Sequence, residues 1–126
     1  MKILLDTHIL LWWMADDRRL PRPARLAIEE PANRVFVSIA SLWETAIKFS
    51  LKRVVADPEA LREAAERDEF SLLPIEARHC SAVARLPRHH SDPFDRLLGA
   101  QALVEPMRLL TDDAQLVRHG DTVVVV

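Results

Sequence analysis

Short apolar runs alternate with longer amphipathic stretches along the chain, and this alternation most limits the possible folds. A continuous apolar run suits a strand buried on both faces, and the stretches between the runs have the apolar spacing of helices. This order predicts an α/β protein whose central sheet is mainly parallel and covered by helices on both faces. Strands are expected at residues 1–5, 35–37, 70–73, 107–110 and 122–126, which gives a sheet of four to five strands.

The expected helices lie at residues 8–14, 23–30, 38–52, 58–68, 76–86 and 93–104, with one short helical turn after Asp113. The longest, at residues 38–52, carries Ile39, Trp43 and Ile47 at a spacing that predicts one buried apolar face. Trp12 and Trp13 are expected to pack in the core or at a dimer contact rather than to stack on nucleic-acid bases.

The length and the rare residue types exclude several classes of protein. At 126 residues the chain can bury roughly two-thirds of its unfolded surface, so residues 1–126 are predicted to form one domain. Two glycines, Gly99 and Gly120, are too few for the glycine-rich loops that bind nucleotides. The single cysteine, Cys80, excludes an internal disulfide. Because no signal peptide or spanning helix is recognisable, a cytoplasmic protein without a membrane partner is expected.

Acidic residues follow the predicted strands or open the helices beside them. In an open α/β sheet the strand ends and the following helix starts share one edge, where ligands bind, so these side chains are expected to converge. They are Asp6, Glu44, Asp92, Asp95, Asp112 and Asp113.

Helix capping explains each of these positions as well when it is taken alone. Ser41 and Glu44 have the spacing of a capping box, and Asp92 precedes a proline at the start of a helix. If Ser38 caps the long helix instead, Glu44 lies nearly two turns inside it, on the apolar side. Asp95 also shares a helix ridge with apolar residues. Buried carboxylates that repel one another need a cation, because each alone is costly to bury.

An all-oxygen ligand set favours a hard cation, Mg²⁺ or alternatively Mn²⁺, over zinc. An acidic cluster that holds such an ion suits phosphodiester hydrolysis, because the ion lowers the pKa of a bound water. A zinc site is disfavoured because His79, Cys80, His89 and His90 lack the spacing of zinc ligands. Of these, Cys80 is expected to be a small core residue, and the two adjacent histidines to lie in a loop near the substrate.

Four segments together resemble the PIN-domain ribonucleases, and most of all the VapC-type toxins of toxin-antitoxin pairs. They are LLDTH at residues 4–8, VSIASLWE at 37–44, HHSDPFDRLL at 89–98 and LTDD at 110–113. The resemblance implies a three-layer α/β/α sandwich and Mg²⁺-dependent endonuclease activity on RNA. It also implies a homodimer and a cognate antitoxin whose C-terminal segment blocks the active-site groove.

Matched to the family's motifs, the residues expected to hold the metal and to act in catalysis are Asp6, Glu44, Asp95 and Asp113. Those expected to support them are Thr7, Ser38, Asp92, Thr111 and Asp112. One departure from the family pattern is Gly99, where a branched apolar residue is expected. A glycine inside a helix costs about 1 kcal/mol.

Two other functions also fit a chain of this kind. A non-catalytic module could keep the fold and bind RNA or protein, although binding alone does not require buried like charges. A phosphate-accepting receiver domain also combines an α/β fold, Mg²⁺ and aspartates. It needs a lysine near the late strands, and no lysine follows Lys52.

The net charge of −2 argues mildly against an RNA partner, whose phosphates attract basic surfaces. If four acids belong to a metal pocket, however, 15 acidic residues remain against 17 basic ones. Fourteen of the basic residues are arginines, which suit bidentate phosphate contacts. Arg53, Arg88 and Arg96 are the candidates for contacts with the substrate.

Overall fold

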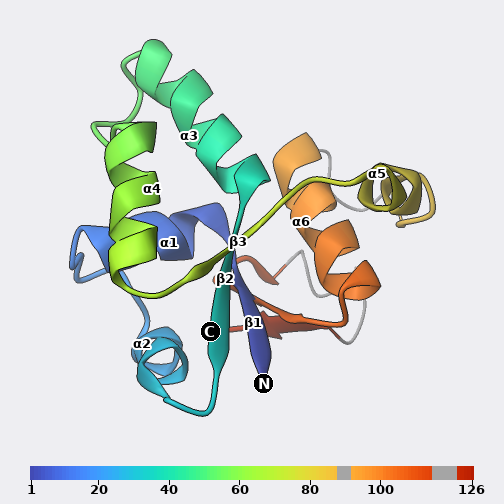
Figure 1. Ribbon diagram of the computed structural model, residues 1–126, viewed down its shortest axis with the longest axis horizontal. Helices are drawn as coiled ribbons and strands as arrows, with labels where there is room; N and C mark the ends of the chain where they lie inside the picture. The colour runs from blue at the N-terminus through green and yellow to red at the C-terminus, as the bar shows by residue number, and fades with distance from the viewer. Residues whose placement is uncertain (88–91, 115–121) are drawn as a thin grey trace.

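The computed structural model describes residues 1–87, 92–114 and 122–126, and its centre is a five-stranded sheet in which every neighbouring pair is parallel (Figure 1). The strand order is β3-β2-β1-β4-β5. The strands are β1 Lys2–Leu5, β2 Arg34–Ser38, β3 Ser71–Leu73, β4 Arg108–Thr111 and β5 Val123–Val125. The predicted α/β class and the parallel sheet are therefore confirmed.

Helices follow the predicted positions closely. They are α1 Thr7–Met14, α2 Arg22–Glu29, α3 Ile39–Ser50, α4 Pro58–Arg67, α5 Ala77–Val83 and α6 Pro93–Val104. The largest difference is α5, which ends at Val83 rather than near Leu86. The helical turn expected after Asp113 falls largely on residues 115–121, outside the described residues.

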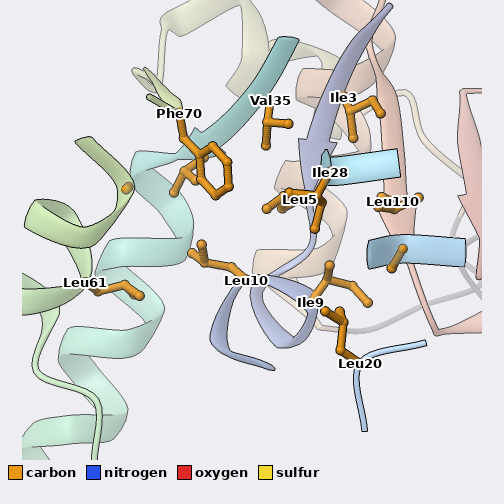
Figure 2. Close-up of a cluster of buried hydrophobic side chains, with 13 residues drawn as sticks. Ile3, Leu5, Ile9, Leu10, Leu20, Ile28, Val35, Leu61, Phe70 and Leu110 are labelled. Atoms are coloured by element: carbon orange, nitrogen blue, oxygen red, sulfur yellow. The ribbon is translucent and has the colours of Figure 1, made fainter. Parts of the chain in front are cut away.

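Side chains of each strand alternate between two apolar clusters, one on each face of the sheet. Ile3 and Leu5 of β1 point into the first cluster, where they meet Ile9 of α1, Ile28 of α2 and Leu61 of α4 (Figure 2). The intervening Leu4 points the other way, into a cluster with Leu98 and Ala102 of α6 and Ala40 at the start of α3. Helices thus cover both faces, which confirms the three-layer arrangement.

Strand register places the site. Leu5 pairs with Leu110, so Asp6 and Thr111 come next at the same edge. Ser38, the last residue of β2, pairs with Leu73, so α3 starts from that edge too.

The predicted buried face of α3 is wrong. Trp43, Ile47 and Leu51 are 55%, 37% and 57% exposed, whereas the buried residues of the helix are Ala40, Ser41, Glu44 and Thr45. The reason is that α3 rises beyond the end of β2, beside α4, instead of lying across the sheet (Figure 1). Its small and polar side therefore faces the protein. Of its large apolar residues, Trp43, Ile47 and Phe49 are exposed, whereas Leu42 packs against the first cluster.

Two further expectations have opposite outcomes. Trp12 and Trp13 pack against the first cluster, as predicted, and the Trp13 ring lies 6.1 Å from that of Phe70. Cys80 is exposed, so its expected place in the core is wrong. In α5, whose residues are all described, His79 is the buried one and takes the inward position.

Within the described ranges, none of the helices is long and apolar enough to cross a membrane.

Candidate active site

Asp6 lies at the junction of β1 and α1, and both of its carboxylate oxygens accept hydrogen bonds. Oδ1 accepts from the His8 amide at 2.7 Å, which caps α1, and Oδ2 accepts from the Thr111 hydroxyl at 2.5 Å. The residue is 3% exposed. Burial raises the pKa of Asp6 above its ordinary value, and the Asp112 charge adds to this, while the two hydrogen bonds partly offset it. The carboxylate that caps α1 therefore also contacts the residue that ends β4.

Thr111 connects Asp6 with Asp113. Its hydroxyl donates to Asp6 and also accepts from the Asp113 amide at 3.0 Å, which fixes the turn after β4. Thr111 is fully buried, whereas Asp112 is exposed and Asp113 is partly buried. The structure thus brings together acidic residues that are more than 100 positions apart in the sequence.

A hydrogen bond between two hydroxyl groups joins α1 to α3. The Thr7 hydroxyl donates to that of Ser41 at 2.9 Å, and both residues are buried. Ser41 lies one helical turn before Glu44, so this contact holds the Glu44 side of α3 close to Asp6. The cap of α3 is Ser38, whose hydroxyl accepts from the Ala40 amide at 3.0 Å. Glu44 is therefore an interior helix residue, and the capping box with Ser41 is not formed.

Glu44 is 6% exposed, and its two oxygens differ. Oε2 accepts from the Lys48 ammonium at 2.7 Å. Oε1 is buried and has no hydrogen-bond partner in the part of the chain that the structure describes. Such an orphaned oxygen is rare because it loses its hydration without compensation. This oxygen could act as a ligand for a cation.

The start of α6 brings Asp92 and Asp95 to the same region. One oxygen of Asp92 accepts from the amides of Phe94 and Asp95, at 2.8 and 3.1 Å, and so caps the helix. Phe94 meets Trp43 edge to face, with 5.0 Å between ring centroids. These rings directly precede Asp95 and Glu44 in the sequence, so α6 and α3 are in contact beside the two acidic positions. Among the described residues, no three of the acidic side chains in this region bring their ligand atoms within 4.8 Å of one another. We call the sheet edge with Asp6, Glu44, Asp95 and Asp113 the acidic edge.

Lys48 was not predicted from the sequence as a residue of the site, although Glu44 and Lys48 have the i, i+4 spacing of a helical ion pair.

The structure describes two of the three arginines predicted to contact the substrate. Arg53 is exposed just beyond α3. Two N–H groups of Arg96 donate to the main-chain carbonyls of Pro87 and Val83, at 2.8 and 2.9 Å. Arg88, His89 and His90 lie outside the described residues.

A second polar group, the His79 cluster, consists of the buried His79 and Gln101, the partly buried Glu105 and the exposed Glu76. His79 Nδ1 accepts from the Glu76 amide at 3.0 Å, so Nε2 carries the ring proton and donates to Glu105 at 2.6 Å. The Gln101 side chain accepts from the Ser38 hydroxyl at 2.6 Å, and its amide lies 3.3 Å from His79 Nδ1. Ser38 and Gln101 thereby connect this cluster to the start of α3.

The His79 cluster has the ligand types and spacing for a metal ion, because one ligand atom from each of Glu76, His79 and Glu105 lies within 4.8 Å of the others. Its hydrogen bonds argue against that use. Nε2 is already a donor, and the Arg78 guanidinium pairs with both glutamates. A metal ion would have to displace this proton and this cation, so the cluster is better described as a closed structural network.

Comparison with known proteins agrees with the fold and the motifs. The PIN domain family matches residues 3–121. Ribonuclease VapC22 of Mycobacterium tuberculosis (strain ATCC 25618 / H37Rv) is 35% identical over 121 residues, which cover 93% of this chain and 91% of the relative. The chain therefore belongs to the PIN domain family, and its resemblance to the VapC-type members is confirmed.

Solved structures share the fold at lower identity. A toxin-antitoxin complex from Klebsiella pneumoniae superposes with a TM-score of 0.67 at 20% identity, covering 98% of this chain and 96% of that one. VapBC2 from Rickettsia felis, bound to a DNA fragment from its promoter, gives 0.66 at 16% identity, covering 100% and 98%. FitAcB from Neisseria gonorrhoeae also gives 0.66 at 16% identity, covering 98% and 96%.

Proposed function

We propose that this protein is a Mg²⁺-dependent endoribonuclease that hydrolyses RNA phosphodiester bonds, and that it acts as the toxin of a toxin-antitoxin pair. The observation that carries the proposal is the buried Oε1 of Glu44, which has no hydrogen-bond partner among the described residues and lies on the acidic edge. Membership in the PIN domain family and the named activity of the VapC22 relative support it.

The residues that would hold the ion are Asp6, Glu44, Asp95 and Asp113. Their donor set is made of oxygen atoms, which suits Mg²⁺ and also Mn²⁺. A bound ion would lower the pKa of a water molecule and stabilise the charge of the phosphate.

The surrounding residues hold these acids in place. Thr111 fixes Asp6 and the turn that carries Asp113, while Thr7 and Ser41 fix the spacing between α1 and α3. Ser38 and Asp92 start the helices that present the remaining two acids. Asp112, exposed beside Asp6, adds negative charge at the mouth of the site.

RNA is the proposed substrate, and arginine is the proposed contact with its phosphates. Arg53 is exposed beyond the end of α3 and is the first candidate. Arg88 precedes α6 in sequence, and Arg96 lies in its first turn, where its N–H groups donate to main-chain carbonyls; we propose both for the same role.

A cognate antitoxin is the proposed regulator, and the active form is proposed to be a homodimer. The structural neighbours from Klebsiella pneumoniae and Rickettsia felis were solved as toxin-antitoxin or VapBC assemblies. Trp43, Ile47 and Leu51 leave an apolar surface on α3 that a partner chain would cover. Co-purification with the product of a neighbouring small gene tests the partner, and light scattering of the isolated protein tests the dimer.

The activity is tested with the protein purified free of any partner. Total cellular RNA should be cleaved with Mg²⁺ and should remain intact with a chelator or with Asp6→Asn. Equal cleavage by this variant, or cleavage that ignores the chelator, would contradict the mechanism. RNA binding without cleavage would instead favour the non-catalytic module.

A further inference from the structure

Lys48 holds one oxygen of the buried Glu44 carboxylate. It lies in the last turn of α3, and its Nζ is 2.7 Å from Glu44 Oε2. The Lys48 side chain is about one-third exposed, whereas that of Glu44 is nearly buried. The Glu44 end of this ion pair is therefore buried, and the Lys48 end is partly open to solvent.

The two oxygens of Glu44 are made unequal by this contact. A carboxylate rotates easily about its last bond, because the torsion has broad, two-fold preferences. Lys48 occupies Oε2 and leaves Oε1 as the one without a partner among the described residues. Glutamate followed by lysine four residues later is the favourable order in a helix, and a cation in the last turn also interacts well with the helix dipole.

We propose that Lys48 is a positioning residue of the acidic edge: it fixes Glu44 through Oε2, so that Oε1 alone is presented to the cation. This inference rests on the proposed function, because it takes Glu44 as a metal ligand. It adds a second effect of the same contact. The ammonium places a positive charge beside the site, and it weakens the attraction of the acidic edge for a divalent ion.

These two effects predict changes of opposite sign, which a purely structural ion pair does not. Lys48→Gln removes the positive charge, so Mn²⁺ should bind about three- to tenfold more tightly. The same change frees the Glu44 carboxylate, so RNA cleavage at saturating Mn²⁺ should fall by about tenfold or more. Mn²⁺ binding is measured by calorimetry on the chelator-treated protein, and cleavage is measured on total cellular RNA.

Lys52→Gln is the matched control, because Lys52 is exposed one turn further along the chain and the substitution changes the charge equally. It should leave Mn²⁺ affinity and cleavage within twofold of the original protein. Lys48→Arg is the second variant. It keeps the charge, so Mn²⁺ affinity should stay within twofold and cleavage should be partly retained.

Failure of this inference is distinguishable from failure of the proposed function. If the original protein binds no Mn²⁺, or if Glu44→Gln binds it as well as the original protein does, the proposed metal site is wrong and the role of Lys48 is overturned with it. If the original protein and Glu44→Gln behave as proposed but Lys48→Gln matches Lys52→Gln, the inference on Lys48 alone is overturned. Weaker Mn²⁺ binding by Lys48→Gln, or by Lys48→Arg, overturns it too.

Discussion

The acidic edge and the His79 cluster are polar groups beside α6 that each include two buried side chains, yet they are built differently. In the His79 cluster the ring nitrogens of His79 are both used, and Arg78 supplies a positive charge to the two glutamates. At the acidic edge Lys48 supplies a cation to one carboxylate, and a buried oxygen of Glu44 stays unpartnered among the described residues.

The two regions differ in how completely their polar atoms are paired, and this distinguishes a closed structural network from a site that can accept a ligand. A closed network gains its stability from its own hydrogen bonds, and the loss of one member leaves a buried partner unsatisfied. A site that keeps an excess of buried negative charge loses stability for it when no cation is bound. Substitutions in the two regions should therefore change opposite properties.

The largest expected effect is on catalysis, from Asp6→Asn. Loss of a metal-holding carboxylate should reduce the rate of RNA cleavage on the order of 10³-fold, since a bound ion supplies several kcal/mol of charge stabilisation. Cleavage is followed under single-turnover conditions with saturating Mg²⁺. A reduction of less than tenfold would place Asp6 outside the chemistry.

The same variant should not lose stability in the absence of metal. Burial raises the pKa of Asp6, so the folded chain holds this proton more tightly than the unfolded chain does. Stability from this group is therefore present at low pH and falls as pH rises above the ordinary value of 3.8. Asp6→Asn removes that loss, and its chelator-treated form should unfold at a higher temperature than the original protein at pH 7.

The next largest effect is on folding, from His79→Ala. It removes a fully buried ring together with its contacts to Glu105 and Gln101, so it should lower the free energy of unfolding by about 3 kcal/mol. Denaturant unfolding measures this change. The matched control is Cys80→Ala, the exposed neighbour, which should change stability by less than about 0.5 kcal/mol. Similar values for the two variants would contradict the closed network.

A smaller effect is expected from Gln101→Met, which changes the link between the two regions at nearly constant volume. The Ser38 hydroxyl loses its acceptor, and His79 loses a neighbouring donor. The cost should be about 1–2 kcal/mol in the free energy of unfolding. Cleavage should fall by less than it does in Asp6→Asn. Loss of all activity in a well-folded Gln101→Met protein would show that the regions are not separate.

The smallest effect concerns the pH dependence contributed by Glu105. The hydrogen bond from His79, together with Arg78, lowers the pKa of Glu105 below its ordinary value of 4.5. The stabilisation is therefore present above pH 4.5 and is lost as pH falls through the folded-state pKa. Glu105→Gln should be less stable than the original protein at pH 7, by less than about 1 kcal/mol, and the difference should shrink in acid. A constant difference would contradict this assignment.

The sequence predicts the sheet and the place of the acids because both follow from local patterns. Continuous apolar runs suit strands covered on two faces, and acids directly after such runs must meet at one edge. From the sequence, an acid at the start of a helix fits either a helix cap or a site residue. The structure shows that one oxygen of Asp6 caps α1 and that the other accepts a hydrogen bond from Thr111.

The errors come from tertiary placement. The apolar stripe of α3 predicts burial, but the helix projects beyond the sheet and leaves Trp43 and Leu51 exposed. Cys80 fits an apolar helix, but the inward position of α5 belongs to His79. Lys48 was overlooked because an i, i+4 pair is common on solvated helices, and its burial at one end is visible only in the fold.

The central position of β1 has a consequence for the order in which the proposed site forms during synthesis. The ribosome makes β1 first, but its neighbour β4 and the Thr111 hydroxyl that holds Asp6 come 105 residues later. Until then the middle of the sheet has one open side, and Asp113 does not yet exist. A growing chain that has not yet reached β4 therefore lacks the assembled acidic edge, and the proposed nuclease activity requires β4 and Asp113 to have been made.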